Sequence, residues 1–540
     1  MEDTMQTRLT VAIIAFAAAA ALARGADGWR TSESARARLH ADRIAELERT
    51  YRGADGFDAF LAQERESLGE ALSSLAGDTA PRRMPGMKLE AYFAENDGSA
   101  QPFWTYAPPA EDGAAASGEG APLLVYLHGY VPYYDIVNTP TIPYMMTSLV
   151  ARAGAYIAAP FGRSNTDFQG PGEQDVLRVI DEMHARYGID RDRVLLVGYS
   201  MGGMGAWSAG GRFAERFNAM LIMSGRSDYY VWHEVEPAAV PQWQRRIIDT
   251  QFGTPWLKRL VDMPILAVHG GLDPLVTVKQ GRYPVDELKK LGSENVELLV
   301  LPESAHAIAA DAFADKRVAE FVEANLERRN AKRPQPLGRI PGFTGSRAQD
   351  ALLSPFVMVS PSVLTLERRA AEWRRFAKGE APRMVETADM ASATTGAESA
   401  PGTESAPDAV KAAKLRDRAL LVFGEPEASP LARRVLEEGG VKIAPDSFEF
   451  AGRTFPREGR GLWFSGRNPF NPALPAIVQC GAQWGAGASE NHLYDRIPDV
   501  AVYSVEPESC AGVDTETLNK VVAAGFFADD GTFAWCDDAP

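Results

Sequence analysis

The pattern of apolar and polar residues changes twice before residue 330. Residues 28–76 place apolar side chains at steps of three and four, the period of amphipathic helices. From 88 to 106 the period becomes two, and Asn96-Asp97-Gly98 between the two alternating runs predicts a β-hairpin. Short apolar segments then alternate with amphipathic ones, which is typical of a parallel sheet with helices on both faces.

This alternation predicts both strands and helices. The strands are expected at 122–127, 155–159, 193–198, 218–223, 264–269 and 296–301 and the helices at 143–152, 172–187, 201–216 and 308–328. The pattern breaks between Ser224 and Asp262, where tyrosines and tryptophans cluster. We expect an insertion there over the C-terminal edge of the sheet, where open α/β folds bind ligands. Packing is an equally good interpretation of its aromatic rings.

A second alternation follows a linker at 331–349, which is rich in Arg, Pro and Gly. Residues 350–540 are expected to form a smaller α/β domain with a disordered insertion at 388–412, which has almost no large apolar residues. The fold class is therefore α/β: a mostly parallel sheet with helices on both faces, followed by a smaller C-terminal α/β domain.

Composition narrows the class of protein and its partners. The chain has 540 residues, 45% hydrophobic and 24% charged, as in soluble globular proteins. A formal net charge of −16 argues against nucleic acid and anionic lipid as partners. The cysteines Cys480, Cys510 and Cys536 lack metal-binding spacing, so we predict no metal site and no cofactor; Cys510 and Cys536 are the pair expected if a disulfide forms.

The N-terminus carries an apolar run from Leu9 to Leu22, which is too short to span a membrane. The run ends in Ala21-Leu22-Ala23, the small-x-small pattern of signal cleavage. We therefore expect a signal peptide at 1–23 and an exported protein without a stable membrane anchor; a buried Ala-rich helix is the alternative. A helical segment at 24–87 and a catalytic domain at 88–330 would follow.

The strongest chemical signal is Gly198-Tyr199-Ser200-Met201-Gly202. It follows an apolar strand and begins a helix, the context of a nucleophile elbow. Glycines at the flanking positions allow close backbone approach, and the helix N-terminus favours developing negative charge. The sequence predicts Ser200 as a nucleophile, with a plain glycine-rich turn as the alternative.

A serine nucleophile needs a base, and the base needs a carboxylate. In this fold the expected order is Ser, acid, His. His306 follows the strand at 296–301 and is the expected base, while Asp273 follows the preceding strand and is the first choice of acid. Asp228, one strand earlier, is the rival acid. His128 and His269 are expected to position turns, and His492 to be structural.

The oxyanion needs two N–H donors. We assign one to Met201, directly after the nucleophile, and one to the main chain of Tyr130, because Gly129 lets that backbone turn inward. An ordinary glycine turn is the alternative at Gly129. The expected substrate-pocket residues come from the aromatic insertion: Tyr229, Tyr230, Trp232 and His233.

The stretch Arg193 to Trp207 resembles the elbow of prolyl-oligopeptidase-like and polyhydroxybutyrate-depolymerase-like esterases, which are secreted α/β-hydrolases. The stretch His269 to Val276 is similar to the acid loop of acyl-protein thioesterases and carboxylesterases, although those enzymes usually have Pro where Thr277 stands. The resemblance covers about residues 88–330 and implies the α/β-hydrolase fold, with Ser200 as nucleophile, Asp273 as acid and His306 as base. It also implies that 160–163 and 170–175 line the pocket, for which a purely structural loop is an equal alternative. Residues 350–540 resemble the C-terminal extension of some of these hydrolases.

Three functions remain open at this point. We favour an exported serine hydrolase that cleaves carboxylic esters through an acyl-enzyme, with a small-molecule ester or short peptide as substrate. Esters are preferred because no propeller-length domain precedes residue 88. The alternatives are a prolyl-oligopeptidase-family serine peptidase and a non-catalytic binding protein on a hydrolase fold. The sequence leaves the oligomeric state undefined.

Overall fold

The computed structural model describes residues 28–77, 80, 84–110, 117–329, 334–337, 346–379, 383–387, 415–485, 490–509 and 517–536. The expected signal peptide at 1–23, the expected disordered insertion at 388–412 and Cys510 lie outside these residues. The chain divides into two compact units: unit 1 comprises Met1–Ala94, Ala100–Trp232 and Phe252–Leu337, and unit 2 comprises Glu95–Ser99, His233–Gln251 and Gly338–Pro540. The expected catalytic domain, 88–330, therefore contributes two short stretches to unit 2.

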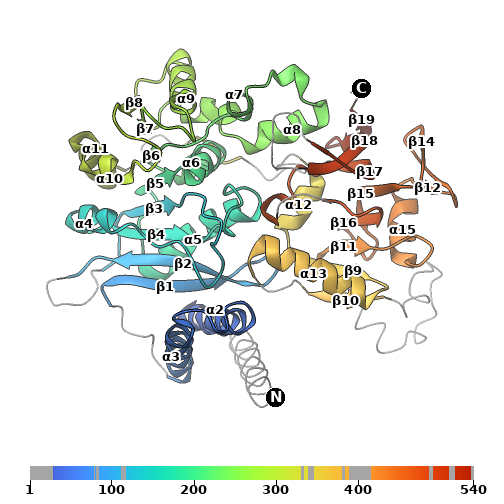
Figure 1. Ribbon diagram of the computed structural model, residues 1–540, viewed down its shortest axis with the longest axis horizontal. Coiled ribbons are helices and arrows are strands. Elements are labelled where there is room, and N and C mark those ends of the chain that lie inside the picture. Colours follow the sequence, from blue (N-terminus) through green and yellow to red (C-terminus); the bar gives the residue numbers. More distant parts are fainter. Residues whose placement is uncertain are drawn as a thin grey trace. The chain divides into compact units, whose positions relative to one another are not determined.

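Unit 1 is built on an eight-stranded sheet in the order β1-β2-β4-β3-β5-β6-β7-β8 (Figure 1). The strands are β1 Gly86–Phe93, β2 Ala100–Ala107, β3 Leu123–Leu127, β4 Tyr156–Pro160, β5 Val194–Tyr199, β6 Ala219–Met223, β7 Ile265–Gly270 and β8 Val296–Leu301. The β1–β2 hairpin is antiparallel, β2 pairs antiparallel with β4, and the remaining neighbours are parallel. The predicted α/β class, with a mostly parallel sheet, is confirmed.

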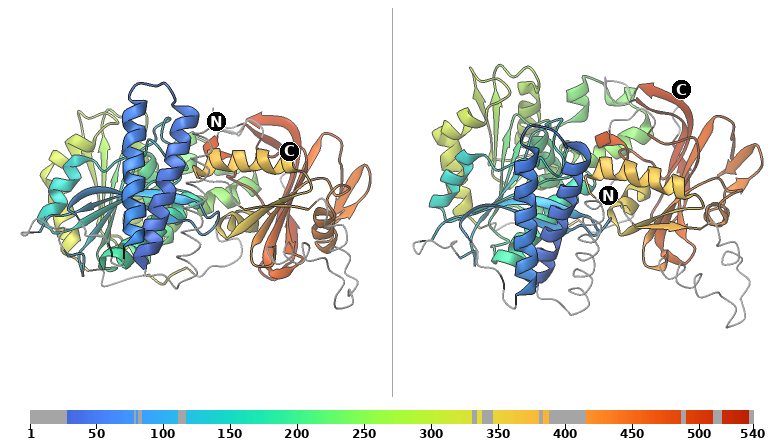
Figure 2. Two further views of the ribbon diagram at one scale, coloured as in Figure 1. Left: turned by 90° about the horizontal axis from the view of Figure 1, so that it is seen from below. Right: turned by 60° about the horizontal axis from the view of Figure 1, so that its bottom comes forward.

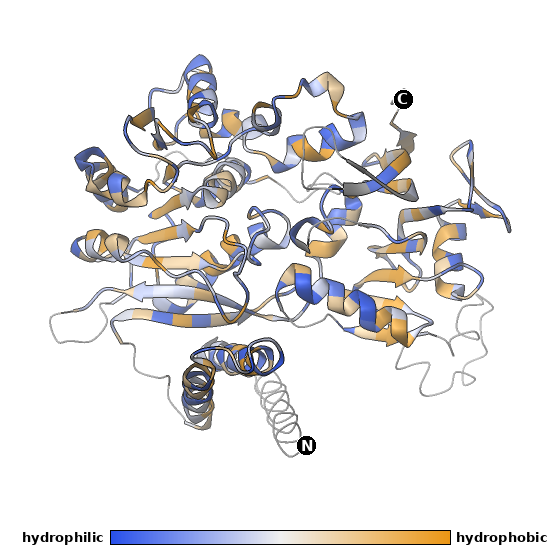
Figure 3. Cartoon of the chain, in the orientation of Figure 1, coloured by the Kyte–Doolittle hydropathy of each residue, from blue (hydrophilic) through white to orange (hydrophobic). Residues whose placement is uncertain are grey.

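Helices cover both faces of this sheet because its strands are apolar on both sides. Along β5, Val194 and Leu196 belong to one core cluster, and Leu195 and Val197 to the other. The first cluster receives α5 (Pro171–Tyr187), α6 (Met201–Arg212) and α9 (Val278–Lys290), and the second receives α4 (Tyr144–Arg152), α10 (Ala309–Ala314) and α11 (Lys316–Glu327). The central strands are accordingly coloured as hydrophobic in Figure 3.

Two helical regions of unit 1 differ from the expected pattern. The single helix expected at 308–328 is two helices, because Asp315 is extended (φ −75°, ψ 127°) and its side chain accepts the N–H of Arg317, capping α11. Helix α9 has no counterpart in the sequence-based assignment, since Gly281 and Pro284 lie inside it. Short 3₁₀ turns at Ala214–Arg216 and Thr254–Leu260 complete the connections of unit 1, and a third at Pro237–Ala239 lies in unit 2.

The N-terminal helices α2 (Gly28–Thr50) and α3 (Phe57–Ala76) form an antiparallel pair that lies across β1 and β2 (Figure 2). Glu64 of α3 ties them together, because its carboxylate lies 2.7 Å from both His40 Nδ1 and Arg43 Nη2 of α2. Burial pushes the pKa of Glu64 up, but the hydrogen bonds with His40 and Arg43 outweigh it and lower the pKa to about 2. The contact between the helices therefore depends on an ionised carboxylate.

Unit 2 contains a second eight-stranded sheet in the order β10-β9-β11-β16-β15-β17-β18-β19. Its strands are β9 Phe356–Ser360, β10 Met384–Glu386, β11 Ala419–Phe423, β15 Arg460–Asn468, β16 Asn471–Gly481, β17 Val500–Ser509, β18 Thr517–Phe527 and β19 Phe533–Trp535. The four strands from β10 to β16 in this order are parallel, and the rest of the sheet is antiparallel. A small separate sheet contains β12 Lys442–Ile443, β13 Ser447–Phe450 and β14 Arg453–Pro456.

Helices also cover the sheet of unit 2. They are α12 Arg347–Leu353, α13 Val363–Ala377 and α15 Pro430–Glu438, together with α8 Gln242–Gln251 from the first half of the chain. In α8, Trp243 and Ile247 pack with Ala524 and Phe526 in one apolar cluster. The other early stretch is held by Asp97, whose carboxylate accepts the indole N–H of Trp373 at 2.9 Å. Both stretches are thus bound by specific side-chain contacts within unit 2.

Candidate active site

Ser200 lies in the sharp turn between β5 and α6. Its backbone has φ 53° and ψ −114°, a left-handed conformation that non-glycine residues rarely adopt. The turn requires its glycines, because a Cβ on Gly202 would overlap the carbonyl of Leu127 and a Cβ on Gly198 would overlap the carbonyl of Gly202. The hydroxyl is therefore presented at the N-terminus of α6, where backbone N–H groups point outward.

A continuous chain of hydrogen bonds leads from this hydroxyl to a buried carboxylate. His306 Nε2 lies 2.8 Å from Ser200 Oγ, and His306 Nδ1 lies 2.7 Å from Asp273 Oδ2. The side chain of Asp273 is fully buried, and its Oδ1 accepts the N–H groups of Leu275 and Val276 at 2.9 Å each. With its Nδ1–H donated to Asp273, the imidazole presents the Nε2 lone pair to the serine hydroxyl.

Strand topology explains why these three residues meet. They follow β5, β7 and β8, which are parallel, so all three lie at the carboxyl edge of the sheet. Asp228, the rival acid, is used elsewhere, because its Oδ1 accepts the N–H of Val231 at 2.9 Å in the first turn of α7 (Tyr229–His233). The structure thus pairs His306 with Asp273.

The two other histidines near this edge are buried. His269 Nε2 lies 2.7 Å from the carbonyl of Val276, and His128 has ring nitrogens 2.9 Å and 3.0 Å from the carbonyls of Gly129 and Phe161. Burial lowers the pKa of both imidazoles. Each side chain therefore contacts the backbone of a loop beside the triad, as expected of residues that position turns.

The expected oxyanion donors lie next to the nucleophile. Met201 is the first residue of α6, so its N–H is among those free at the helix N-terminus. A Cβ built on Gly129 would lie 3.5 Å from the Cβ of Ser200, so the backbone at Gly129–Tyr130 passes beside the nucleophile. The arrangement can polarise a carbonyl and stabilise the negative charge that develops on its oxygen.

The expected pocket residues all fall on α7 but differ in their surroundings. Tyr229 is almost wholly buried and packs edge-on against Tyr230 and Phe252, at ring distances of 5.6 Å and 5.5 Å. Trp232 lies beneath the guanidinium of Arg226 at 5.1 Å, and His233 belongs to unit 2. A role of these residues in substrate binding stays a prediction.

The loop between β4 and α5 contains polar residues whose roles the sequence analysis missed. Asp167 forms an ion pair with Arg226 at 2.6 Å, and Asn165 hydrogen-bonds both backbone groups of Val131. These contacts join loops that follow three different strands, so no local pattern in the sequence reveals them. The only local signal is a short polar run, Arg163 to Asp167, directly after an apolar strand.

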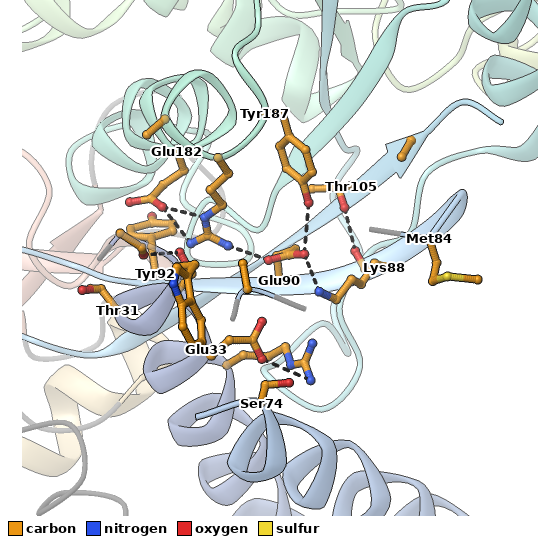
Figure 4. Close-up of a pocket in the computed structure, with 18 of the residues that line it drawn as sticks. Thr31, Glu33, Ser74, Met84, Lys88, Glu90, Tyr92, Thr105, Glu182 and Tyr187 are labelled. Atoms are coloured by element: carbon orange, nitrogen blue, oxygen red, sulfur yellow. Dashed lines mark hydrogen bonds and ion pairs between the residues drawn. The ribbon is translucent and has the colours of Figure 1, made fainter. Parts of the chain in front are cut away.

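A cavity of about 1010 Å³ in unit 1 lies between α2, α3, β1, β2 and α5, and none of the triad residues lines it (Figure 4). Glu90 lies at its centre and contacts Lys88, Arg186 and Tyr187 at 2.9 Å, 2.6 Å and 3.1 Å. These contacts join β1 to α5, and Arg36 of α2 pairs with Glu33 at 3.4 Å in the same wall. The acidic side chains in the wall are thus paired with basic ones, on α2 and between β1 and α5.

Metal and membrane sites were also sought in the described part of the chain. Within those residues, no cluster of three or more His, Cys, Asp or Glu side chains has an arrangement that could hold a metal ion. No helix among them has the length and apolar character needed to cross a bilayer.

The sheet order, the strained serine turn and the Ser200–His306–Asp273 hydrogen bonds together define a serine hydrolase with the α/β-hydrolase fold. Residues 167–327, which include all three side chains, match the sequence model of the prolyl oligopeptidase family. This part of the chain is therefore similar to the prolyl oligopeptidase family.

Two curated proteins show what the chain is similar to. Dipeptidyl-peptidase 5 of Porphyromonas gingivalis is 23% identical over 273 residues, which cover 46% of this chain and 39% of that protein. A bifunctional acetylxylan esterase/xylanase of Neocallimastix patriciarum is 32% identical over 139 residues, which cover 25% of this chain and 19% of that protein. The matches thus span well under half the length of these relatives.

Solved structures also resemble the chain in part. An acylaminoacyl peptidase of Pyrococcus horikoshii is 18% identical with a TM-score of 0.36, over 46% of this chain and 43% of that one. A thermostable esterase is 20% identical with a TM-score of 0.33, over 44% of this chain and 62% of that one.

Proposed function

We propose that the protein hydrolyses carboxylic esters through an acyl-enzyme on Ser200. The single observation that carries this proposal is the hydrogen-bonded chain from Ser200 Oγ through His306 to the buried Asp273. His306 Nε2 takes the hydroxyl proton as Oγ attacks the carbonyl carbon, and the N–H groups of Met201 and Tyr130 donate to the resulting oxyanion. His306 then protonates the departing alkoxide, and water repeats the sequence on the acyl-enzyme.

The surroundings of the site support an ester with an apolar group. Four large apolar side chains are exposed on the loops that carry the acid and the second oxyanion donor, namely Tyr130, Tyr133, Leu272 and Leu275. Exposed apolar residues beside a reaction centre suit contact with an uncharged acyl or alcohol group. The likeness to an acetylxylan esterase/xylanase points the same way.

Peptide hydrolysis is the second candidate, and the likeness to dipeptidyl-peptidase 5 favours it. The same triad can cleave an amide, because His306 can protonate an amine leaving group as it does an alkoxide. A third candidate, a binding protein on a hydrolase fold, would need no intact triad. We also propose that the protein is exported, on the strength of the apolar run at Leu9–Leu22 and the small-x-small pattern that ends it.

The test compares p-nitrophenyl acetate and butyrate with acyl-peptide and dipeptide p-nitroanilides on the wild type and on Ser200→Ala. The proposal predicts ester turnover that falls by about 10⁴-fold or more in the variant. Higher kcat/KM for the anilides than for the esters would make peptidase the primary function. Equal ester turnover by both proteins would overturn the acyl-enzyme.

A further inference from the structure

The loop Gly129–Asp135, which follows β3 and carries the second oxyanion donor, belongs to no helix or strand. Tyr130 and Tyr133 are 57% and 65% exposed, and the loop pairs with no strand. An N–H group stabilises an oxyanion only when its direction is fixed before the reaction. Some other part of the fold must therefore hold this backbone in place.

Asn165, in the loop after β4, makes that contact. Its Nδ2 donates to the carbonyl of Val131 at 2.8 Å, and its Oδ1 accepts the N–H of Val131 at 3.1 Å. The side chain uses both its donor and its acceptor on one residue, which fixes the orientation of the amide. Asn165 is only 3% exposed, so water competes little for these bonds.

Neighbouring contacts join the same two loops. Ser164 Oγ donates to the carbonyl of Tyr134 at 2.9 Å, and the ring of His128 contacts the carbonyl of Phe161 at 3.0 Å. The loop that carries Asn165 is itself strained, because four of its non-glycine residues have positive φ: Arg163, Ser164, Asp167 and Phe168. Such strain persists only where the surrounding structure enforces it, and it concentrates at functional sites.

We infer that Asn165 is a positioning residue that fixes the oxyanion loop and thereby the direction of the Tyr130 N–H. This inference rests on the proposed function. Val131 directly follows Tyr130, so holding both backbone groups of Val131 fixes the two peptides that follow the donor and limits the rotation of the Tyr130 backbone. Asn165 touches no reacting atom, and its effect should appear in transition-state stabilisation while substrate binding stays nearly unchanged.

The experiment compares Asn165→Ala with Asn218→Ala. Asn218 is a matched control because it is also buried, and its Nδ2 donates to the carbonyls of Asn325 and Arg328 next to the start of β6, at the opposite edge of the sheet. For each protein, kcat and KM for p-nitrophenyl acetate are measured together with Tm and the inhibition constant of phenylboronic acid, whose tetrahedral adduct needs the oxyanion donors.

Asn165→Ala is expected to lower kcat by about 10²-fold, with KM within about threefold, and to weaken boronate inhibition in parallel. Asn218→Ala is expected to lower Tm and leave kcat and boronate inhibition nearly unchanged. Asn165→Asp can still accept the Val131 N–H but places a second oxygen against the Val131 carbonyl, so its loss of kcat should be at least as large as that of Asn165→Ala. If Asn165→Ala does not fold, Asn165→Asp decides the question, and unchanged kcat and boronate inhibition in it overturn the inference.

Equal losses of kcat in Asn165→Ala and Asn218→Ala would also overturn the inference. That result leaves the proposed function intact as long as Ser200→Ala is inactive. Retained turnover in Ser200→Ala would instead remove the proposed function itself, so the two failures are distinguishable.

Discussion

Serines stand at helix N-termini in both units, but they use their hydroxyls differently. In unit 2, Ser362 and Ser429 cap α13 and α15, accepting the N–H of Thr365 at 3.3 Å and of Ala432 at 3.2 Å. In unit 1, Ser200 occupies the same position before α6 but makes no capping bond, and its hydroxyl faces His306. A serine hydroxyl at a helix start ordinarily stabilises the helix. Because Ser200 has a positive φ, its hydroxyl does not cap α6 and is instead hydrogen-bonded to His306.

The two sheets extend this contrast. Both sheets have parallel strands that end in loops before helices. The buried charged side chains near these strand ends have different partners in the two units. Near the end of β16 in unit 2, the buried Arg369 of α13 forms an ion pair with Glu372 and donates to the side-chain oxygen of Gln479, so its charge is paired within the core. In unit 1 the buried Asp273 instead bonds a histidine that is itself partly exposed. Parallel strands followed by helices therefore carry a buried ion pair of the core in unit 2 and a reactive site in unit 1.

The largest expected effect is the loss of the acid in unit 1. Asp273→Asn should lower kcat by about 10⁴-fold, because an amide no longer enforces the imidazole tautomer that accepts the serine proton. Asp228→Asn is the control, since Asp228 caps α7 and does not contact His306. Steady-state kinetics measure kcat of both variants. A larger loss of kcat in Asp228→Asn than in Asp273→Asn would show that Asp228, and not Asp273, is the catalytic acid.

The next effect concerns stability in unit 2. Arg369→Met should lower the free energy of unfolding of unit 2 by about 3–5 kcal/mol, because the buried Glu372 loses its ion-pair partner and keeps only the hydrogen bond from Gln483. Arg434→Met, which removes a more exposed pair with Glu438, should cost less than about 1 kcal/mol. Denaturant unfolding measures both, and kcat per folded molecule should stay unchanged. If Arg369→Met lost as much kcat as Asp273→Asn, unit 2 would contribute to catalysis and the contrast between the units would be wrong.

A backbone change sharpens the comparison within unit 1. Gly202→Ala should cost about 2–3 kcal/mol and reduce kcat, because the new methyl group meets the carbonyl of Leu127. Gly69→Ala, inside α3 where an added Cβ would meet no neighbouring side chain, should stabilise the protein by roughly 0.5–1 kcal/mol. Thermal unfolding distinguishes them. Equal stability changes in the two variants would show that the tight elbow is not required.

The smallest effect is the pH dependence of the contact between α2 and α3. Because the folded pKa of Glu64 is lowered from 4.5 to about 2, its contribution is full above pH 4.5 and is lost as the pH falls toward 2. The stability advantage of the wild type over Glu64→Gln at pH 6 should therefore shrink steadily as the pH falls from 4.5 toward 2. Glu70→Gln, at an exposed position on α3, should show no such trend. An advantage that does not change with pH would contradict the ionic contact.

Features encoded locally were predictable from the sequence. The serine turn follows from its glycines and the apolar strand before it, and the order Ser, Asp, His follows from the strands that precede each residue. The resemblance to known hydrolases added the acid loop. The alternation of apolar and amphipathic segments was enough to predict the sheet, because each segment carries its own period.

Features that depend on distant contacts were not predictable. Asn165 acts on Val131, 34 residues away, and Arg226 pairs with Asp167 across two loops. Tyr229 and its neighbours looked like pocket residues by composition, but only the fold shows that Tyr229 is buried. The assignment of 233–251 to unit 2 depends on the packing of α8 against Phe526, which no local pattern records.

The most direct test of the account is fluorophosphonate labelling followed by peptide mapping of the wild type, Ser200→Ala and Ser429→Ala. Ser429→Ala loses a helix cap and should be destabilised by about 1 kcal/mol, while it still labels fully. The account predicts a single adduct on Ser200, absent only from Ser200→Ala. Labelling of the wild type elsewhere, or undiminished labelling of Ser200→Ala, would contradict it.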